Sequence, residues 1–506
     1  MKKNILKYTA FALMLGVSSA CSDSYFESNP GDVIVSDQLE NTDPAAGLNG
    51  MYAYMYKYDT MNNGDEVEHS DFGFMSTMLS SELWGQDMVQ YGSKYGWFYT
   101  DYKFSVSSRA YQYTSVFFHW NFFYKLIKTA NDVLLTTSDE TKEQRGQALG
   151  MRAFAYLYLV QMYQHTYAGH QNDPAVPIVT ETSTPEELAE NPRATVEEVY
   201  KLIESDLTQA FSDLEGFSRP NITIIDQHIV AGFMARMYLL KEDWTNAAKY
   251  ANIARTGFQL ADNSAILEGF VDLNKQPSWM WASDVTIDAD IVQSGIINFT
   301  SHISSTAYGY ATAGAMYKNI SSELYARIAD NDVRKDWWCR DTTLITDGPA
   351  SPEKLPPLAN LKFGYYNDNG DNCNDLCYMR AEEMYLIEAE ALAMGGNAAG
   401  GKALLEEFVQ TRQPDYKCTG SSPADIQEAV WVQRRIELWG EGFAWFDLKR
   451  LKKPIVRKYA GSNHKSDALY DFPAEDDIFR ILIPRKEIQD NNGISDADNN
   501  KMPNIE

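Results

Sequence analysis

The chain has 506 residues, 44% of them apolar, and its 70 acidic against 44 basic side chains give a formal charge of −26. This apolar content is sufficient for a large core and excludes a wholly disordered chain. The negative charge argues against nucleic-acid binding and against electrostatic attraction to an anionic membrane, because both need a basic surface.

Residues 1–20 have the features of a bacterial signal peptide. Three lysines precede an apolar stretch at 8–17, which is too short to span a bilayer as a helix. Small residues then lead to Cys21, as in a lipobox, although Ser18 stands where leucine is commoner. We therefore expect cleavage before Cys21 and attachment to the membrane only through acyl chains on this cysteine. The alternative is an ordinary secretory signal followed by an incidental cysteine.

Helical periodicity dominates the rest of the chain. Residues 22–50 are predicted to form an extended tether, and 22 of the 74 residues at 51–124 are aromatic. A first helix is predicted at 117–136. Further helices are predicted at about 141–164, 195–214, 226–241, 244–256, 378–394, 398–412 and 423–439. A capping box of Thr195 and Glu198 marks one of the helix starts.

Two of the predicted helix pairs resemble each other, at 226–256 and at 378–412. In both, small residues face aromatic residues across a short turn, which is the pattern of tetratricopeptide helix pairs. Between about 257 and 377 the helical signal weakens, and short strands or irregular chain are expected at 277–281 and 291–299. The sequence therefore predicts a mostly α fold, with a tetratricopeptide-like helix-pair scaffold, large irregular insertions and a few short strands.

Motifs for catalysis, cofactors and metals are weak. Residues 396–403 nearly match a phosphate-binding loop, but Ala403 lacks the required hydroxyl and a helix precedes the segment, so an inter-helix turn is predicted. The seven histidines are scattered without metal-ligand spacing. Cys373 and Cys377 are interpreted as a structural thiol pair or a local disulfide, with zinc as the alternative. The polar run at 367–375 is interpreted as a solvated loop, with calcium as the alternative. No catalytic residue, cofactor or metal is predicted.

Four blocks of sequence carry a family resemblance. Residues 433–450 read QRRIELWGEGFAWFDLKR, residues 145–160 read RGQALGMRAFAYLYLV, and residues 377–391 read CYMRAEEMYLIEAEA. Residues 478–488 read IFRILIPRKEI and precede an Asn/Asp-rich tail. In this order, and with the lipobox, the blocks resemble the RagB/SusD family of nutrient-binding outer-membrane lipoproteins. The residues of 433–450 themselves indicate a structural role, since their charges alternate in sign around buried aromatic side chains.

The resemblance implies a surface-exposed protein of the outer membrane that binds a nutrient without catalysis. The nutrient is usually a glycan, which is delivered to a SusC-like TonB-dependent transporter; the helix pairs face that partner and the irregular insertions carry the ligand. After the signal peptide, residues 21–225 and 226–506 are expected to form the N- and C-terminal regions of one continuous fold. The alternatives are a peptide cargo in the same complex, a surface glycoside hydrolase and a structural adaptor.

Sugars present flat apolar C–H faces ringed by hydroxyl groups, and so favour aromatic platforms with a polar rim. Aromatic residues interleaved with glycine at 84–102, and others in the irregular region after 257, have this character. The alternative for any single ring is burial in the core. The residues selected as ligand contacts are Trp84, Asp87, Tyr91, Trp97, Tyr99, Trp281, Tyr308 and Tyr310.

Overall fold

Helices make up most of the regular structure in the computed structural model of the protein, which describes residues 43–61, 69–293, 295–341, 343–345, 353–365 and 372–505. No helix within these residues is both long and apolar enough to cross a membrane. The predicted signal peptide, Cys21 and the tether up to residue 42 lie outside the described residues.

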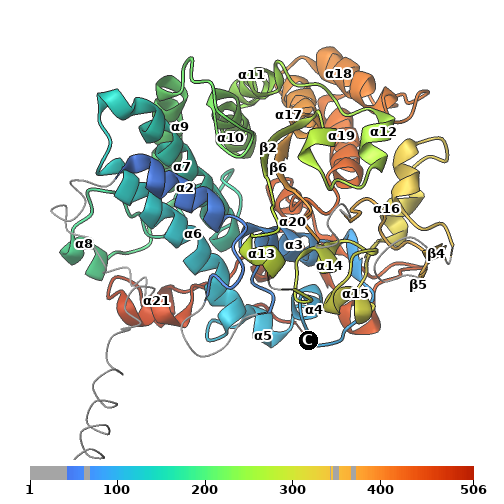
Figure 1. The fold of residues 1–506 in the computed structure, drawn as a ribbon, viewed down its shortest axis with the longest axis horizontal. Helices are drawn as coiled ribbons and strands as arrows, with labels where there is room; N and C mark the ends of the chain where they lie inside the picture. The colour runs from blue at the N-terminus through green and yellow to red at the C-terminus, as the bar shows by residue number, and fades with distance from the viewer. Residues whose placement is uncertain are drawn as a thin grey trace, which may run out of the picture.

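The long helices form the frame of the molecule. They are α2 (Pro44–Tyr54), α3 (Phe74–Trp84), α6 (Thr114–Leu134), α7 (Lys142–Tyr163), α9 (Val196–Asp213), α10 (Gln227–Leu240), α11 (Trp244–Arg255), α17 (Ala381–Met394), α18 (Ala398–Gln410) and α19 (Pro423–Glu437). From α6 onward they pack against one another in sequence, so that an arc of paired helices crosses the molecule from α6 to α19 (Figure 1). This arrangement confirms the predicted mostly α, helix-pair fold.

Short elements fill the space beside this arc. The short helices are α4 (Tyr99–Tyr102), α5 (Val106–Arg109), α8 (Pro185–Ala189), α12 (Asn263–Leu267), α13 (Asp290–Gln293), α14 (Thr300–Ile303), α15 (Tyr310–Ala313), α16 (Ser322–Ala326), α20 (Ala444–Arg450) and α21 (Arg485–Asp490). The strands form antiparallel pairs: β1 (Met88–Gln90) with β3 (Lys318–Ile320), β2 (Trp279–Ser283) with β6 (Leu376–Arg380), β4 (Thr343–Ile345) with β5 (Glu353–Leu355), and β7 (Ile455–Val456) with β8 (Asp471–Phe472).

Several predicted boundaries need correction. The helix predicted at 378–394 begins only at Ala381, because the residues before it pair with β2 as strand β6. Of the two segments expected as short strands or irregular chain, 277–281 contains the start of β2, and 291–299 is largely irregular after the end of α13 in its described residues. The predicted tether ends early, since α2 begins at Pro44 behind an Asp43 cap. Helix α3 was not predicted, because it is buried on all sides and so lacks an amphipathic pattern.

The turn between α17 and α18 covers only residues 395–397, and the rest of the segment 396–403 forms the first part of α18. A Cβ atom added at Gly401 would lie 2.4 Å from the carbonyl oxygen of Ala389, so glycine is what lets α17 and α18 approach closely. Thr195 and Glu198 form the predicted capping box at the start of α9. The alternative of a local disulfide between Cys373 and Cys377 is not formed.

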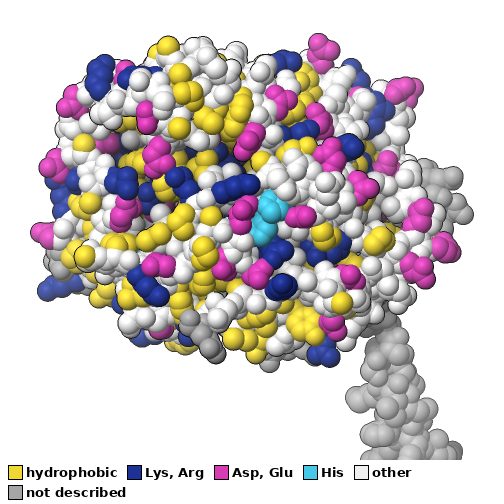
Figure 2. All heavy atoms as spheres, turned by 180° about the vertical axis from the view of Figure 1, so that it is seen from behind, with side chains coloured by type: hydrophobic (Ala, Val, Ile, Leu, Met, Phe, Trp, Pro, Cys, Tyr) yellow, Lys and Arg dark blue, Asp and Glu magenta, His cyan; other side chains and the backbone are white. Residues whose placement is uncertain are grey.

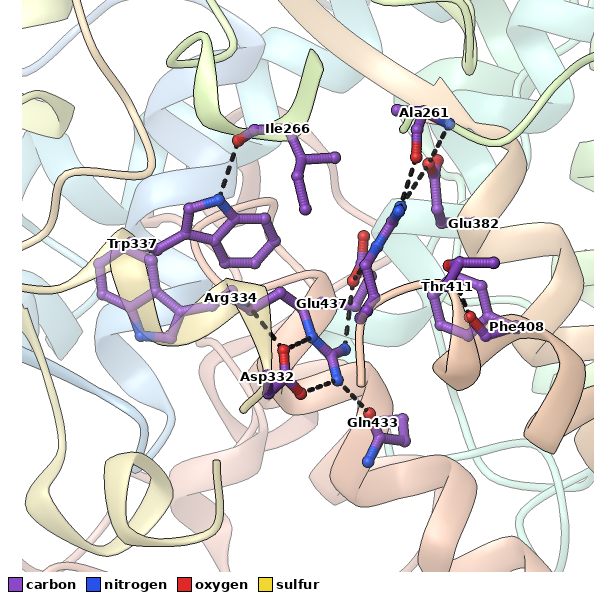
Figure 3. Close-up of polar contacts among 12 residues, drawn as sticks. Ala261, Ile266, Asp332, Arg334, Trp337, Glu382, Phe408, Thr411, Gln433 and Glu437 are labelled. Atoms are coloured by element: carbon purple, nitrogen blue, oxygen red, sulfur yellow. Dashed lines mark hydrogen bonds and ion pairs between the residues drawn. The ribbon is translucent and has the colours of Figure 1, made fainter. Parts of the chain in front are cut away.

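The signature segment 433–450 is part of a buried ionic network, which confirms its predicted structural role. Arg435 pairs with Asp87, and Arg434 pairs with Asp447 across the turn between α19 and α20. Figure 3 shows Arg334 held between Asp332, Gln433 and Glu437. On the face shown in Figure 2, acidic and basic side chains are interspersed, so the excess of negative charge does not form one continuous patch there.

Candidate functional site: an exposed aromatic surface

Three aromatic rings from two distant segments meet at the surface. Tyr95 stacks on Trp97 with ring centroids 4.9 Å apart and an interplanar angle of 24°. Tyr310 lies 6.0 Å from each of these rings. The Tyr95 side chain is 68% exposed and that of Tyr310 is 38% exposed, whereas Trp97 is half-buried. We call Tyr95, Trp97 and Tyr310 the aromatic surface.

Strand pairing brings the two segments together. β1 and β3 are antiparallel, and Tyr91 N donates to Tyr317 O at 2.9 Å just beyond their ends. The chain leaving β1 therefore runs beside the chain that leads into β3. As a result the loop carrying Tyr95 meets α15, and α4, α14 and α15 lie together at the lower edge of the molecule in Figure 1.

The buried side chain of Gln90 fixes the loop between β1 and α4. Its Nε2 donates to Gly92 O at 3.2 Å and to Trp97 O at 3.1 Å, which ties both ends of the loop to one residue. Within the loop, Tyr95 and Phe98 have φ angles of 62° and 49°. Such left-handed conformations are unfavourable for bulky residues and persist only where the surrounding structure fixes them. The aromatic surface is therefore held in place before any ligand arrives.

Polar groups lie buried directly beneath the aromatic surface. The imidazole of His302 is 5.7 Å from the ring of Trp97, and burial together with the Lys318 charge holds the pKa of His302 well below its usual value. Lys318 is itself 1% exposed, and its Nζ donates to Met316 O at 3.0 Å. Loss of hydration lowers the pKa of Lys318 from 10.5 to about 7. The buried Lys318 therefore lowers the stability of the folded protein, because the charged form of its side chain loses its hydration there.

Replacing Lys318 by methionine is expected to raise the free energy of unfolding at pH 7 by up to about 4 kcal/mol. Between pH 7 and 10.5 the unfolded chain binds a proton that the folded chain does not, so this lysine makes wild-type stability rise with pH across that window. Urea unfolding at several pH values should show a flatter rise in Lys318→Met, while the exposed Lys458→Met leaves the wild-type slope. An equal slope in all three proteins would contradict the assignment.

Two further selected tyrosines are exposed near the aromatic surface. Tyr308 is 50% exposed, and its carbonyl oxygen accepts hydrogen bonds from Asn298 at 3.0 Å and Asn372 at 3.1 Å. Tyr91 is also exposed, and Lys465 Nζ lies 4.4 Å from its ring centroid. Both tyrosines come from the segments that carry the three rings. Ligand contact by any of these residues stays a prediction.

Four of the residues predicted to contact the ligand lie in the core instead. Trp84 is 1% exposed and packs against Trp445 at 5.1 Å, with its Nε1 donating to Asp101. Asp87 is buried as the partner of Arg435. The side chains are not available to a ligand, because helix α3 and the signature segment enclose them.

Tyr99 and Trp281 are likewise enclosed. The hydroxyl of Tyr99 donates to Asp467 at 2.7 Å. Trp281 belongs to strand β2, and its Nε1 donates to Thr223 O at 3.0 Å. The tryptophans at 279, 337 and 338 are also buried. Composition alone does not distinguish these rings from exposed ones, since aromatic residues interleaved with glycine also occur in irregular core segments.

Sequence reasoning missed three contributors to this site. Tyr95 belongs to the aromatic segment 84–102 but was not selected, although it is the most exposed ring of the surface. His69 contacts Trp97 edge-on at 5.3 Å from a loop that has no distinctive motif. The side chain of Gln90 donates to backbone carbonyl oxygens of the loop, and no pattern in a single sequence indicates such a role for a buried glutamine.

Comparisons with known proteins agree with this architecture. Residues 44–239 match the model of a SusD-like family described as starch-binding and associating with the outer membrane, and residues 358–502 match the model of the SusD family. The chain belongs to the SusD family. The resemblance inferred from the sequence blocks is thereby confirmed.

Curated relatives and solved structures of this SusD-family protein extend the match. SusD-like protein P2 of Formosa agariphila is 25% identical over 66% of this chain and 71% of the relative. A SusD-like carbohydrate-binding protein from Bacteroides vulgatus superimposes with a TM-score of 0.76 at 24% identity, covering 91% of this chain and 98% of that one. A laminarin-binding SusD-like protein superimposes with a TM-score of 0.61 at 19% identity, covering 89% and 97%. At these identities the structural matches establish the fold.

Proposed function

We propose that this protein binds an oligosaccharide or polysaccharide without catalysis, on the surface formed by Tyr95, Trp97 and Tyr310. The observation that carries this proposal is the exposed, stacked pair of Tyr95 and Trp97 beside Tyr310. Sugar rings stack on such faces through their C–H groups, and the pre-formed loop lowers the entropy lost on binding. The carbohydrate-binding and laminarin-binding names of its structural neighbours support a glycan as the ligand class.

The glycan would then pass to a SusC-like TonB-dependent transporter in the outer membrane, with this protein held at the cell surface by acyl chains on Cys21. The matched family model, which is described as associating with the outer membrane, supports this location. A soluble domain needs more than one lipid chain for stable anchoring, which is what acylation of a lipoprotein cysteine supplies.

Calorimetric titration with a panel of neutral polysaccharides and a mixture of short peptides tests the ligand class. We expect heat of binding with at least one polysaccharide, none with the peptides, and no new reducing ends in the mixture. Binding of peptides alone would favour the peptide alternative. If the wild-type protein released new reducing ends from a polysaccharide, and substitution of one acidic residue abolished this release, the result would favour the glycoside hydrolase.

Mass spectrometry of protein extracted from membranes tests the anchor. We expect an acylated N-terminal Cys21 in the wild-type protein, and release of a Cys21→Ser variant from the membrane fraction, because no acyl chain then retains it. An unmodified Cys21 thiol in membrane-extracted wild-type protein would contradict the proposed anchor.

A further inference from the structure

A narrow groove of about 120 Å³ runs along one face of α6. Helix α6 forms one wall, and the segment 177–191, which includes α8, forms the other together with α21. These three helices lie together at the lower left of Figure 1. The apolar lining includes Phe117, Trp120, Tyr124, Leu135, Val179 and Leu188. None of these residues belongs to the aromatic surface, so the groove is a separate feature of the molecule.

Polar side chains of the groove are bonded to other groups of its walls. The hydroxyl of Tyr124 donates to Pro177 O at 2.7 Å, and Lys128 pairs with Asp132 at 2.9 Å. These groups need no partner from outside the fold. Leu135, in contrast, is 43% exposed at the end of α6. A molecule bound in the groove would therefore gain chiefly by burying apolar surface.

The size of the groove favours an extended stretch of chain as its occupant. A volume of about 120 Å³ corresponds to roughly four water molecules at about 30 Å³ each. A helix with its side chains is at least about 10 Å across, so a helix of a partner protein does not fit. One or two aliphatic side chains of an extended segment would fill such a space.

The chain that precedes α2 reaches the fold at one end of this groove. Helix α2 runs antiparallel to α6, because a Cβ atom added at Gly47 would lie 2.6 Å from Val133, whereas Tyr54 stacks on Phe122 at 5.1 Å. The start of α2 is therefore beside the C-terminal end of α6. Leu135 marks the same end of the groove.

The predicted tether contains one stretch that suits the groove. Residues 33–35 read Val-Ile-Val, which is the only run of three apolar residues between Cys21 and Asp43. β-Branched residues favour extended backbone, in which neighbouring side chains project to opposite sides. Val33 and Val35 could therefore contact one wall while Ile34 contacts the other.

This stretch is also close enough in sequence to reach the whole groove. Val35 precedes Asp43 by eight residues, which span about 26 Å when extended. The wall that α6 contributes, from Phe117 to Leu135, is about 27 Å long. No other part of the chain has to move for residues 33–35 to enter.

We propose that residues 33–35 dock in this groove and hold the N-terminal segment of the mature chain against α6. The seven residues 36–42 form a short linker, which keeps the docking stretch at a high effective concentration beside the groove. A modest apolar contact is then sufficient to keep it bound. If Cys21 carries the lipid anchor proposed above, docking leaves residues 21–32 between the anchor and the fold instead of 21–42. This consequence rests on the anchor, whereas the docking itself does not.

The alkylation rate of an Ile34→Cys thiol in the mature chain tests the docking. Mass spectrometry of the fragment that contains residue 34 distinguishes this thiol from the native cysteines. A docked thiol is shielded, so we expect alkylation at least tenfold slower than in a synthetic peptide of residues 22–42 with the same substitution. A Ser28→Cys thiol, which precedes the docking stretch, should react at the rate of its own peptide.

A second substitution on the groove wall tests whether the groove is the docking place. Adding Leu135→Asp puts a charge into the groove and should speed alkylation of the Ile34→Cys thiol at least tenfold. Leu267→Asp is the matched control, because Leu267 is 45% exposed at the end of α12 and does not line the groove. It should leave the slow rate unchanged.

Thermal unfolding midpoints of the two aspartate variants close to that of the parent protein would show that they are folded. Alkylation of Ile34→Cys at the peptide rate, or an unchanged slow rate in folded Leu135→Asp, would overturn the proposal. Slow alkylation that is lost on dilution would assign the groove to the segment of a second copy and would also overturn it. None of these measurements involves a glycan or an acyl chain, so their failure is distinguishable from failure of the proposed function.

Discussion

Replacing Glu437 by glutamine is expected to lower the free energy of unfolding by about 3 kcal/mol, because it removes a buried carboxylate that three buried arginines share. The arginines then keep the carboxylates of Asp332, Glu382 and Glu441. Glu437 is fully buried, and its carboxylate lies 2.8 Å from Arg380, 3.2 Å from Arg334 and 3.5 Å from Arg412. Burial alone would raise its pKa, but the charges of Arg412, Arg380 and Arg334 hold the pKa well below its usual range. The carboxylate is thus the common partner of three cations.

The lowered pKa also fixes the pH dependence of this effect. A carboxyl group with a lower pKa in the folded state stabilises the protein above its unfolded pKa of about 4.3, and this stabilisation is lost as the pH falls. The stability gap between wild type and Glu437→Gln should therefore narrow below about pH 4. Urea unfolding of both proteins at pH 7 and at pH 3.5 gives the difference in their free energies of unfolding at each pH.

Glu428→Gln is the matched control for this substitution. Glu428 lies on the same helix, but its side chain is 49% exposed and pairs with Lys453. Exposed ion pairs contribute about 0 to 1 kcal/mol, so this variant should unfold almost like the wild type. Equal destabilisation by the two substitutions would show that the buried network does not act as described.

Replacing Trp97 by alanine is expected to weaken glycan binding about 30-fold, which corresponds to about 2 kcal/mol. The indole is the centre of the aromatic surface, since it contacts both Tyr95 and Tyr310. Its loss would remove one face on which a sugar can stack, and Tyr95 would lose the ring that it packs against. Calorimetric titration with the polysaccharide identified in the panel gives the affinity of each variant.

Tyr113→Ala provides the comparison for Trp97→Ala. Tyr113 is 41% exposed at the start of α6 and makes no ring contact with the aromatic surface. We expect its substitution to leave glycan affinity unchanged. A folded Trp97→Ala variant that binds glycan as tightly as the wild type would place the ligand elsewhere on the protein.

Local patterns in the sequence were sufficient for most of the helical frame. The apolar spacing within α6 and α9 and the capping box at Thr195 are properties of neighbouring residues, so a single segment carries them. The alternating charges of 433–450 likewise indicated a structural role. Helix α3 and strand β6 escaped prediction because their state depends on burial by the rest of the chain.

The candidate site was only partly accessible to such reasoning. Aromatic richness at 84–102 and at Tyr308 and Tyr310 is visible in the sequence, and so is the family resemblance. Whether a ring faces solvent is decided by contacts between distant segments: Trp84 packs against Trp445, whereas Tyr95 meets Tyr310 at the surface. The sequence by itself determined the helix pairs, the family and the pool of candidate rings. Only the tertiary structure decided which rings are accessible, because burial results from long-range packing that no local pattern records.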